Sequence, residues 1–226
     1  MSASPAPAKL SASVVVVRDG AQSLEVLLVQ RNEKIAFHGG AWVFPGGRVD
    51  DSDSAGPGNT ELETAKRAAV REAREETGLE LTVDTMLQFA HWTTPIELPK
   101  RFATWFFAAA IEGAVNVRVD QSEIVDYRWM SPARALDLHV AGELNLPAPT
   151  FVTLLRFKAM PNVAGLNARL RGEAVQRFLP RLVPIAGGRC TLYQEDAGYE
   201  ALNFDAVGAR HRLIMQGTDW KYLRDF

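Results

Sequence analysis

Residues 71–79, which read R-E-A-R-E-E-T-G-L, strongly limit the folds open to this chain. In a helix, at about 100° per residue, Glu76 lies about 40° from Glu72, and Glu75 lies about 60° from it on the other side. Three carboxylates on one side of a helix repel one another unless a positive charge lies among them. Carboxylate oxygens are preferred ligands of Mg²⁺ and Mn²⁺. The segment therefore predicts a divalent-metal site or, alternatively, a solvated acidic face paired with neighbouring arginines.

The helix that carries these carboxylates has recognisable ends. Thr60 followed by Glu63 has the spacing of a capping box, and Gly78 is suited to a C-terminal stop. We therefore expect the helix to run from Thr60 to Thr77. Residues 50–59 are rich in Asp, Ser, Gly and Pro, and are predicted to form a loop before it.

Apolar and β-branched runs predict strands on both sides of this helix. Asp19-Gly20 predicts a hairpin between the first two strands, and residues 104–111 are so apolar that a central strand is expected. Ser131-Pro132 predicts the start of a further helix. The predicted strands cover residues 12–18, 24–31, 41–44, 87–91, 104–111 and 124–130.

We divide the chain into a disordered tail over residues 1–10, a main domain over residues 11–140, and a C-terminal extension over residues 141–226 packed on it. The extension is predicted to contain helices at 149–160 and 166–179, and strands at 182–186, 189–193, 211–215 and 220–223. It carries no catalytic motif. Covering the core, shaping a substrate pocket and forming an oligomer interface, as in a homodimer, are its alternative roles.

Composition and charge narrow the functional class. Hydrophobic residues make up 47% of the 226 residues and charged ones 23%, which is typical of a globular protein. A net charge of −2 argues against a nucleic-acid partner. Cys190 is the single cysteine, so an intrachain disulfide is excluded and a reducing compartment is indicated. No targeting or membrane-spanning segment stands out, and we expect a cytoplasmic protein without a membrane partner.

A glycine-rich segment and a glutamate precede the acidic helix. F-P-G-G-R-V-D occupies residues 44–50, and Glu63 lies eight residues before Arg71. With residues 71–79, this resembles the signature of the Nudix hydrolases, G-x5-E-x7-R-E-U-x-E-E-x-G-U, in which U is aliphatic. Gly47 is the counterpart of the first glycine, with about ten residues inserted at roughly 51–60, a length that a surface loop tolerates. The resemblance implies an α+β fold, the α/β/α sandwich with a mixed sheet, followed here by the extension of helices and strands.

The resemblance also assigns roles. It implies hydrolysis of a diphosphate with Mg²⁺ or Mn²⁺ as cofactor, the metal being held by Glu72, Glu75, Glu76 and the backbone of Gly47. Arg71 is expected to orient the glutamates and Glu63 to pair with Arg71, tying the loop to the helix. One glutamate, Glu72 first, is expected to act as a base as well. Gly46, Glu63 and Gly78 are the structural positions of the motif.

A further catalytic carboxylate often follows the motif, and Glu123 is our preferred candidate. Glu97 is a second option, and a surface acid is the alternative interpretation of Glu123.

One branch of the family is similar over a longer stretch. Residues 27–53 have the register of the coenzyme A signature L-L-T-x2-S-x2-L-R-x3-G-x-V-x-F-P-G-G-x2-D-x2-D, although Ala36 stands at its arginine. W-T-T-P at 92–95, P-K-R-F at 99–102 and Y-R-W at 127–129 resemble the peroxisomal-type coenzyme A diphosphatases and their bacterial relatives. This implies that coenzyme A or an acyl-CoA is cleaved to adenosine 3′,5′-bisphosphate and a 4′-phosphopantetheine derivative. The alternatives are nucleoside triphosphates, ADP-ribose or dinucleotides as substrates, and a non-catalytic ligand-sensing module.

Several side chains are candidates for contacts to a nucleotide-type substrate. Aromatic rings stack on bases, and basic groups bind phosphates. A place in the core is the alternative for each aromatic residue. His38 and His91 are interpreted as structural, and Cys190 as a small buried hydrophobic residue. The candidates are Trp92, Phe102 and Trp105 for stacking, and Arg31, Arg48, Lys100 and Arg101 for phosphates.

Overall fold

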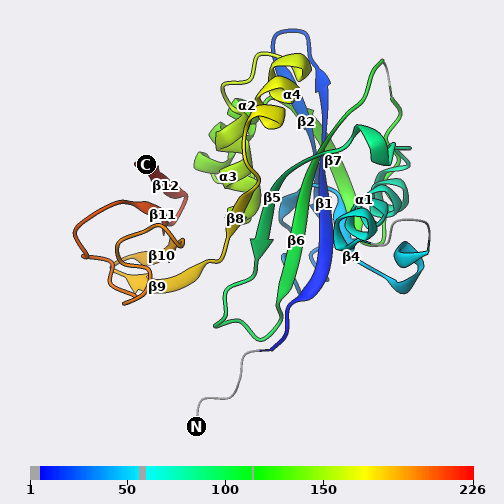
Figure 1. The fold of residues 1–226 in the computed structure, drawn as a ribbon. Coiled ribbons are helices and arrows are strands. Elements are labelled where there is room, and N and C mark those ends of the chain that lie inside the picture. The colour runs from blue at the N-terminus through cyan, green and yellow to red at the C-terminus, as the bar shows by residue number, and fades with distance from the viewer. Residues whose placement is uncertain (1–5, 56–59, 114) are drawn as a thin grey trace.

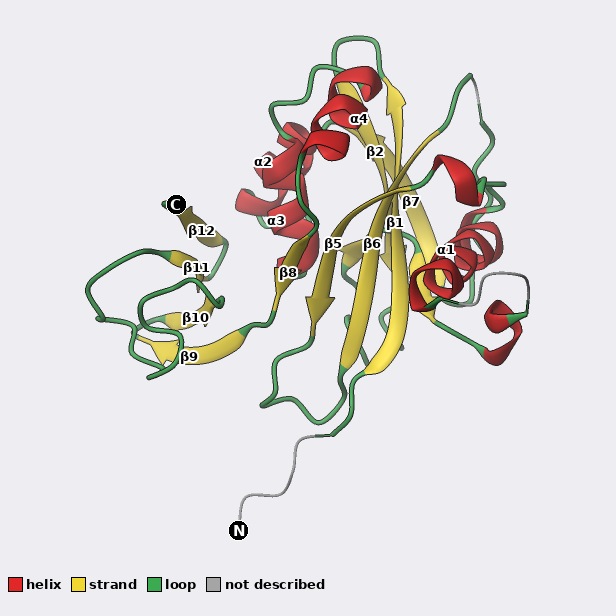
Figure 2. Ribbon diagram, viewed as in Figure 1, coloured by secondary structure: helices red, strands yellow, loops and turns green. Residues whose placement is uncertain are grey.

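A mixed sheet of eight strands lies between helices on both faces (Figures 1 and 2). The computed structural model describes residues 6–55, 60–113 and 115–226. The strands of this sheet are β1 (Lys9–Asp19), β2 (Leu24–Arg31), β3 (Trp42–Val43), β4 (Gly46–Arg48), β5 (Leu87–Thr93), β6 (Phe102–Ala110), β7 (Ile124–Met130) and β8 (Gln176–Phe178). Their order is β3-β2-β1-β6-β5-β8, with β4 also paired to β1 and β7 to β2.

The centre of the sheet is the parallel pair β1 and β6. Val14 to Val17 of β1 are fully buried, because the sheet is covered on both sides. Val14 and Val16 join the core beneath α1 (Glu61–Thr77), whereas Val15 and Val17 join the core on the other face. That second face is covered by α2 (Pro132–Val140), α3 (Ala148–Phe157) and α4 (Val163–Gly172) (Figure 2). The expected α/β/α sandwich with a mixed sheet is confirmed.

Helix α1 has the predicted ends. The Thr60 hydroxyl accepts the N–H of Glu63 at 3.2 Å, and Gly78 closes the helix at φ 70°, its N–H donating to the carbonyl of Arg74. Ala65, Ala68, Ala69 and Ala73 are fully buried. These short side chains form the face of the helix that packs on the sheet, so the glutamates of the last two turns are presented at the sheet edge beside β4.

The predicted strands of the main sheet and the start of α2 at Ser131-Pro132 are confirmed. Two predictions were wrong. The segment expected to be a loop contains a 3-10 helix, η1 (Asp51–Ser54), which Asp50 and Asp53 cap reciprocally; residues 56–59 lie outside the described part. The helix expected over 166–179 ends at Gly172, and β8 follows because Phe178 stacks on Trp92, with ring centroids 3.8 Å apart.

The boundaries of smaller elements also differ from expectation. Strand β1 begins at Lys9, two residues inside the expected tail, because Lys9 and Leu10 pair with β6; residues 1–5 lie outside the described part. A second 3-10 helix, η2 (Val83–Thr85), precedes β5. Within the described part of the chain, none of the helices combines the length and apolarity that crossing a bilayer requires.

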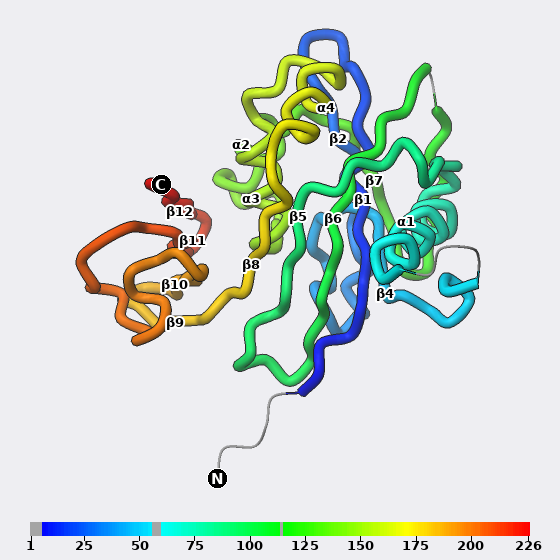
Figure 3. Tube along the Cα trace, viewed as in Figure 1, coloured from blue at the N-terminus to red at the C-terminus, as the bar shows by residue number. Residues whose placement is uncertain are grey.

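The chain ends in a separate antiparallel sheet that lies beside α3 and β8 (Figure 3). Its strands are β9 (Arg181–Ile185), β10 (Gly188–Leu192), β11 (His211–Gln216) and β12 (Asp219–Arg224), in the order β12-β11-β10-β9. All four predicted strands are confirmed. Cys190 and Leu192 are buried on one face of this sheet, so the interpretation of Cys190 as a buried hydrophobic residue is also confirmed.

A buried ion pair fixes the segment between β10 and β11. Arg212 donates from Nε to Asp196 at 2.7 Å and from Nη2 at 2.6 Å, and neither side chain is more than 3% exposed. Burial alone would raise the pKa of Asp196. The hydrogen bonds from Arg212 and from the backbone N–H groups of Gly198 and His211 outweigh this effect, so the pKa lies below its usual range.

Replacing Asp196 with asparagine is expected to lower the free energy of unfolding at pH 7 by about 3 kcal/mol, because Arg212 would remain buried without a counter-charge. The stabilisation from the charged carboxylate is complete above the pKa of an unfolded aspartate, about 3.9, and is lost as the pH falls through the lower folded value. Denaturant titrations at pH 7 and pH 3 should therefore show a smaller difference between the two proteins at pH 3.

The matched control is Asp219→Asn, because Asp219 pairs with Lys221 at 3.2 Å on the exposed surface of the same sheet. Its expected effect is below about 1 kcal/mol at either pH. An Asp196→Asn protein no less stable than this control would contradict the role given to the buried pair.

Candidate active site

Two glycines allow the glutamates of α1 to pack directly on the backbone of β4. Gly46 has φ 153°, and its N–H donates to Oε2 of Glu76 at 2.9 Å. A Cβ at Gly47 would lie 2.4 Å from Oε1 of Glu72. The carbonyl of Gly47 accepts a hydrogen bond from the Ser11 hydroxyl at 2.6 Å. A side chain at Gly47 would displace the Glu72 carboxylate, and a Cβ at Gly46 would lie 2.3 Å from the carbonyl oxygen of Ala12 in β1, which explains the need for this pair.

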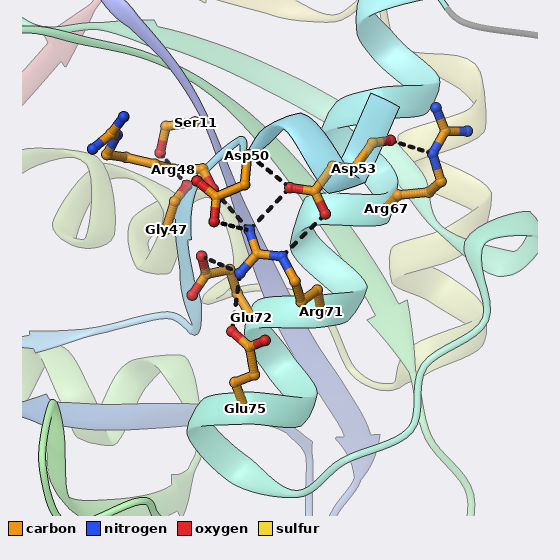
Figure 4. A network of polar contacts seen from close by, with 9 residues as sticks. All are labelled: Ser11, Gly47, Arg48, Asp50, Asp53, Arg67, Arg71, Glu72 and Glu75. Carbon is orange, nitrogen blue, oxygen red and sulfur yellow. Dashed lines mark hydrogen bonds and ion pairs between the residues drawn. The ribbon is translucent and has the colours of Figure 1, made fainter. Parts of the chain in front are cut away.

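Arg71 is the hub of a polar network at the same place (Figure 4). It donates to both carboxylate oxygens of Asp53, at 3.0 and 2.9 Å, and to Glu72 and Glu75 at 2.9 Å each. It also donates to the carbonyl of Arg48 at 2.9 Å. The hydrogen bonds with Asp53 contribute most to raising the pKa of Arg71 above its usual range. Arg71 therefore joins the inserted segment, the glycine loop and two glutamates.

The expected pairing of Glu63 with Arg71 is wrong. Glu63 lies near Lys66, 3.3 Å away on the first turn of α1, and Asp53 is the acid that ties the loop to Arg71. Asp53 is 4% exposed, and its Oδ2 also accepts the N–H of Asp50 at 2.8 Å. The inserted segment thus supplies the partner because η1 folds back onto the helix. Asp53 is the last position of the coenzyme A signature, which was the available sequence signal.

Three carboxylates act on one another at this end of the helix. Glu76 is only 5% exposed, and burial raises its pKa to about 8, despite the hydrogen bond from Gly46 and the nearby charge of Arg31. Glu72 and Glu123 raise the pKa of Glu76 further by repulsion. Burial likewise raises the pKa of Glu72, which Arg71 only partly offsets. Glu123 lines the cleft with Glu72 and acts electrostatically on both helix glutamates, and its role as a further catalytic carboxylate stays a prediction.

This donor set fits a hard divalent cation. Its members are carboxylate and carbonyl oxygens, and a cation would offset both the burial, which contributes most to the raised pKa values of Glu72 and Glu76, and the smaller repulsion between the carboxylates. In the described part of the chain no three acidic, histidine or cysteine side chains already converge around one point. Glu72 and Glu75 turn toward Arg71, and Glu76 turns toward Gly46.

A cleft of about 740 Å³ opens in front of these carboxylates. Its lining comes from several parts of the chain, including the segments at 35–38 and 145–150. The catalytic end includes Gly46, Gly47, Glu72 and Glu123. The β5–β6 region contributes Trp92, Lys100 and Phe102, and the C-terminal sheet contributes Arg189, Thr191, Tyr193, Met215 and Trp220. Among the alternatives for the extension, shaping the cleft is thus the one that its contacts support.

The predicted substrate residues separate into two groups. Arg31, Arg48, Trp92, Lys100 and Phe102 line the cleft. Trp92 is only 5% exposed and stacks on Phe178, so most of its ring belongs to the core.

Arg101 and Trp105 are not among the residues that line the cleft, contrary to expectation. Arg101 donates to the carbonyls of Thr94 and Ala6. Trp105 faces α1, where its Nε1–H donates to Glu61 at 2.9 Å. Glu97 is likewise not among the lining residues.

Sequence reasoning overlooked three residues of the cleft. His38 was interpreted as structural but lines it, at φ 57° in the segment between β2 and β3. Arg189 and Tyr193 line it from the C-terminal sheet. No motif surrounds these two residues, so no sequence signal could have found them. Their place depends on how the second sheet lies against the first.

A glutamate-bearing helix on a glycine loop, set in a mixed sheet between two helical layers, defines the Nudix class of hydrolase. The family model described as NUDIX domain matches residues 7–147, which is more than half of the chain. The chain therefore belongs to the Nudix hydrolase family, and the resemblance found in the sequence is confirmed.

Individual proteins agree with this assignment. A NUDIX hydrolase from Alicyclobacillus acidocaldarius has the same fold, with a TM-score of 0.64 at 23% identity, over 75% of this chain and 98% of that one. The chain is 30% identical to the acyl-coenzyme A diphosphatase NUDT19 of Homo sapiens, over 48% of this chain and 30% of that protein. It is 39% identical to the peroxisomal coenzyme A diphosphatase ndx-8 of Caenorhabditis elegans, over 27% of this chain and 23% of that protein. The matched segments thus span less than a third of these two relatives.

Proposed function

We propose that the protein is a metal-dependent pyrophosphohydrolase that cleaves the diphosphate of a nucleotide-type substrate. The observation that carries this proposal is the position of Glu72 and Glu123 at the wall of the cleft, with Glu76 held behind them against the Gly46 backbone. Buried carboxylates that repel one another beside a glycine loop destabilise the folded protein unless a cation binds between them. The cleft in front of them is large enough for a nucleotide.

Glu72, Glu75, Glu76 and the carbonyl of Gly47 would hold the metal, with Mg²⁺ and Mn²⁺ as the candidates. When bound, such a cation neutralises the diphosphate and lowers the pKa of a water molecule. Arg71 orients Glu72 and Glu75 from the outer side of the helix. Asp53 holds Arg71 in place through two hydrogen bonds, so the orientation of the glutamates depends on the inserted segment.

Glu72 is the group that we assign as general base. It lines the cleft, and burial raises its pKa above the usual range of a glutamate, which makes its carboxylate a stronger acceptor for a proton from water. Glu123 is the alternative base, since it lines the same end of the cleft from the segment before β7.

For the substrate, we favour coenzyme A or an acyl-CoA. Two relatives are named as diphosphatases of this kind, and the cleft combines basic residues with an apolar wall that includes Phe102, Met215 and Trp220. Nucleoside triphosphates, ADP-ribose and dinucleotides are the alternatives. The cytoplasmic location and the homodimer stay predictions.

Product analysis by mass spectrometry tests this proposal. The protein is incubated with Mg²⁺ or Mn²⁺ and with coenzyme A, ADP-ribose or a nucleoside triphosphate mixture, and Glu76→Gln serves as the blank. We expect 4′-phosphopantetheine and adenosine 3′,5′-bisphosphate from coenzyme A. Cleavage of another substrate alone would retain the hydrolase and reject coenzyme A, and cleavage of none would contradict the proposed function.

A further inference from the structure

Four basic side chains line the cleft without an acidic partner. These are Arg31, Arg48, Lys100 and Arg189, and no ion pair joins any of them to an acid in the described residues. Basic side chains elsewhere in the protein are commonly paired, as Arg71 and Arg212 are. Unpaired cations concentrated in one cleft indicate an anionic ligand.

Arg31 lies within electrostatic range of the helix glutamates. Its charge opposes the rise in the pKa of Glu76, and its Nε is buried without a hydrogen-bond partner in the described part of the chain. A buried donor of this kind is destabilising unless a ligand satisfies it. Arg31 is therefore the cation placed to meet the diphosphate that is cleaved.

Arg189 reaches the cleft from the opposite wall. Side chains alternate along strand β10, so Arg189, Thr191 and the following Tyr193 face the cleft, while Cys190 and Leu192 face the core of the C-terminal sheet. The Arg189 side chain is exposed, and within the described part of the chain it forms no hydrogen bond or ion pair. The strand thus presents a guanidinium where no structural role requires one.

His38 links the two arginines in space. Burial lowers the pKa of His38, and the charges of Arg31 and Arg189 lower it further. All three side chains line the same cleft. The basic groups therefore extend from Arg31, beside Glu76, past His38 to Arg189 on the second sheet. The cleft therefore has basic groups beside the carboxylates and also on the second sheet.

We propose that Arg189 is a specificity-determining residue that binds a phosphate group of the substrate other than the diphosphate that is cleaved. The substrate class is a nucleotide diphosphate that carries an additional phosphomonoester. Such a group has nearly two negative charges and three acceptor oxygens, which an arginine binds through charge-assisted hydrogen bonds. This inference rests on the proposed function and adds the C-terminal sheet to the substrate site.

Binding of product-like nucleotides tests the role of Arg189 without any need for hydrolysis. Isothermal titration calorimetry of the 226-residue protein compares adenosine 5′-monophosphate with adenosine 3′,5′-bisphosphate and adenosine 2′,5′-bisphosphate. We expect one bisphosphate to bind about tenfold more tightly than the monophosphate. A preference for the 3′,5′ isomer would indicate a coenzyme A type of substrate, and a preference for the 2′,5′ isomer would indicate a 2′-phosphorylated dinucleotide.

Variants then assign this preference to one side chain. Arg189→Gln should bind all three nucleotides with nearly equal affinity, and Arg189→Lys should restore part of the preference. Arg171→Gln is the matched control, because Arg171 is exposed at the end of α4 and does not line the cleft. Equal affinity of the wild-type protein for all three nucleotides, or a preference that persists in Arg189→Gln, would overturn the inference. Failure of the proposed function would appear separately, as absent turnover in the product analysis.

Discussion

Replacing Glu76 with glutamine is expected to lower kcat by about a thousandfold, because a contact to the metal worth several kcal/mol is lost. In the presence of a metal chelator, the same substitution is expected to raise the free energy of unfolding. The Glu76 carboxylate is buried beside Glu72 and its pKa is raised to about 8, whereas glutamine is neutral and can still accept the N–H of Gly46. Loss of activity together with a gain in stability separates a functional site from a structural one.

The sign of the pH dependence follows from the raised pKa. The pKa of Glu76 is higher in the folded protein than in the unfolded chain. Such a carboxyl group favours folding at a pH below its pKa in the unfolded chain. This contribution to stability is lost as the pH rises through its pKa in the folded protein, which is about 8. The stability gained by Glu76→Gln in chelator should therefore be larger at pH 8.5 than at pH 5. Thermal unfolding of both proteins at pH 5 and pH 8.5, with chelator or with Mn²⁺, measures this difference in stability.

The matched control is Glu80→Gln, which removes an exposed carboxylate just beyond α1. It should leave activity and stability unchanged, and added Mn²⁺ is expected to stabilise this variant and the wild-type protein equally. A Glu76→Gln protein that retains full activity would contradict the metal site.

Replacing Asp53 with asparagine is expected to lower the free energy of unfolding by about 3 kcal/mol, because Arg71 would lose the charged group that accepts hydrogen bonds from its Nε and Nη2. We also expect kcat to fall by about tenfold to a hundredfold, since Arg71 would no longer hold Glu72 and Glu75 in place. Denaturant titration and initial rates measure the two effects.

The control for this change lies two residues earlier. Asp51→Asn alters an exposed acid in the same 3-10 helix and should change the free energy of unfolding by less than about 0.5 kcal/mol. If Asp53→Asn behaved like this control, the ordering of Arg71 would have to come from elsewhere.

Local signals in the sequence were sufficient for most elements of the fold. The cap at Thr60, the stop at Gly78 and the apolar runs of the strands each depend on neighbouring residues, and all were predicted correctly. The positions of the helix glutamates were likewise predictable from helical spacing. The hydrogen bond between Arg71 and Asp53 could not be predicted, because an inserted segment whose conformation the sequence does not indicate lies between the two residues.

Trp105 shows why it is hard to predict from sequence which face of a doubly buried sheet contacts the substrate. Phe102, Thr104 and Phe106 line the cleft, whereas Trp105 between them faces α1. Alternation along β6 fixes which residues share a face, but both faces are apolar. Nothing in the composition of the strand marks the face that meets the substrate. Strand β8 was missed for a related reason, since three residues are too few to show a period.

The catalytic helix and the far wall of the cleft are packed independently. No residue of β9 to β12 belongs to the core beneath α1, while the second sheet has a small core of its own and shares the core of α2 to α4. If the C-terminal sheet contacts the substrate as proposed, substitutions in these four strands are expected to change substrate preference while leaving the packing beneath α1 intact. For protein engineering, the C-terminal sheet would then be a selectivity element that can be exchanged without altering the helix of the glutamates.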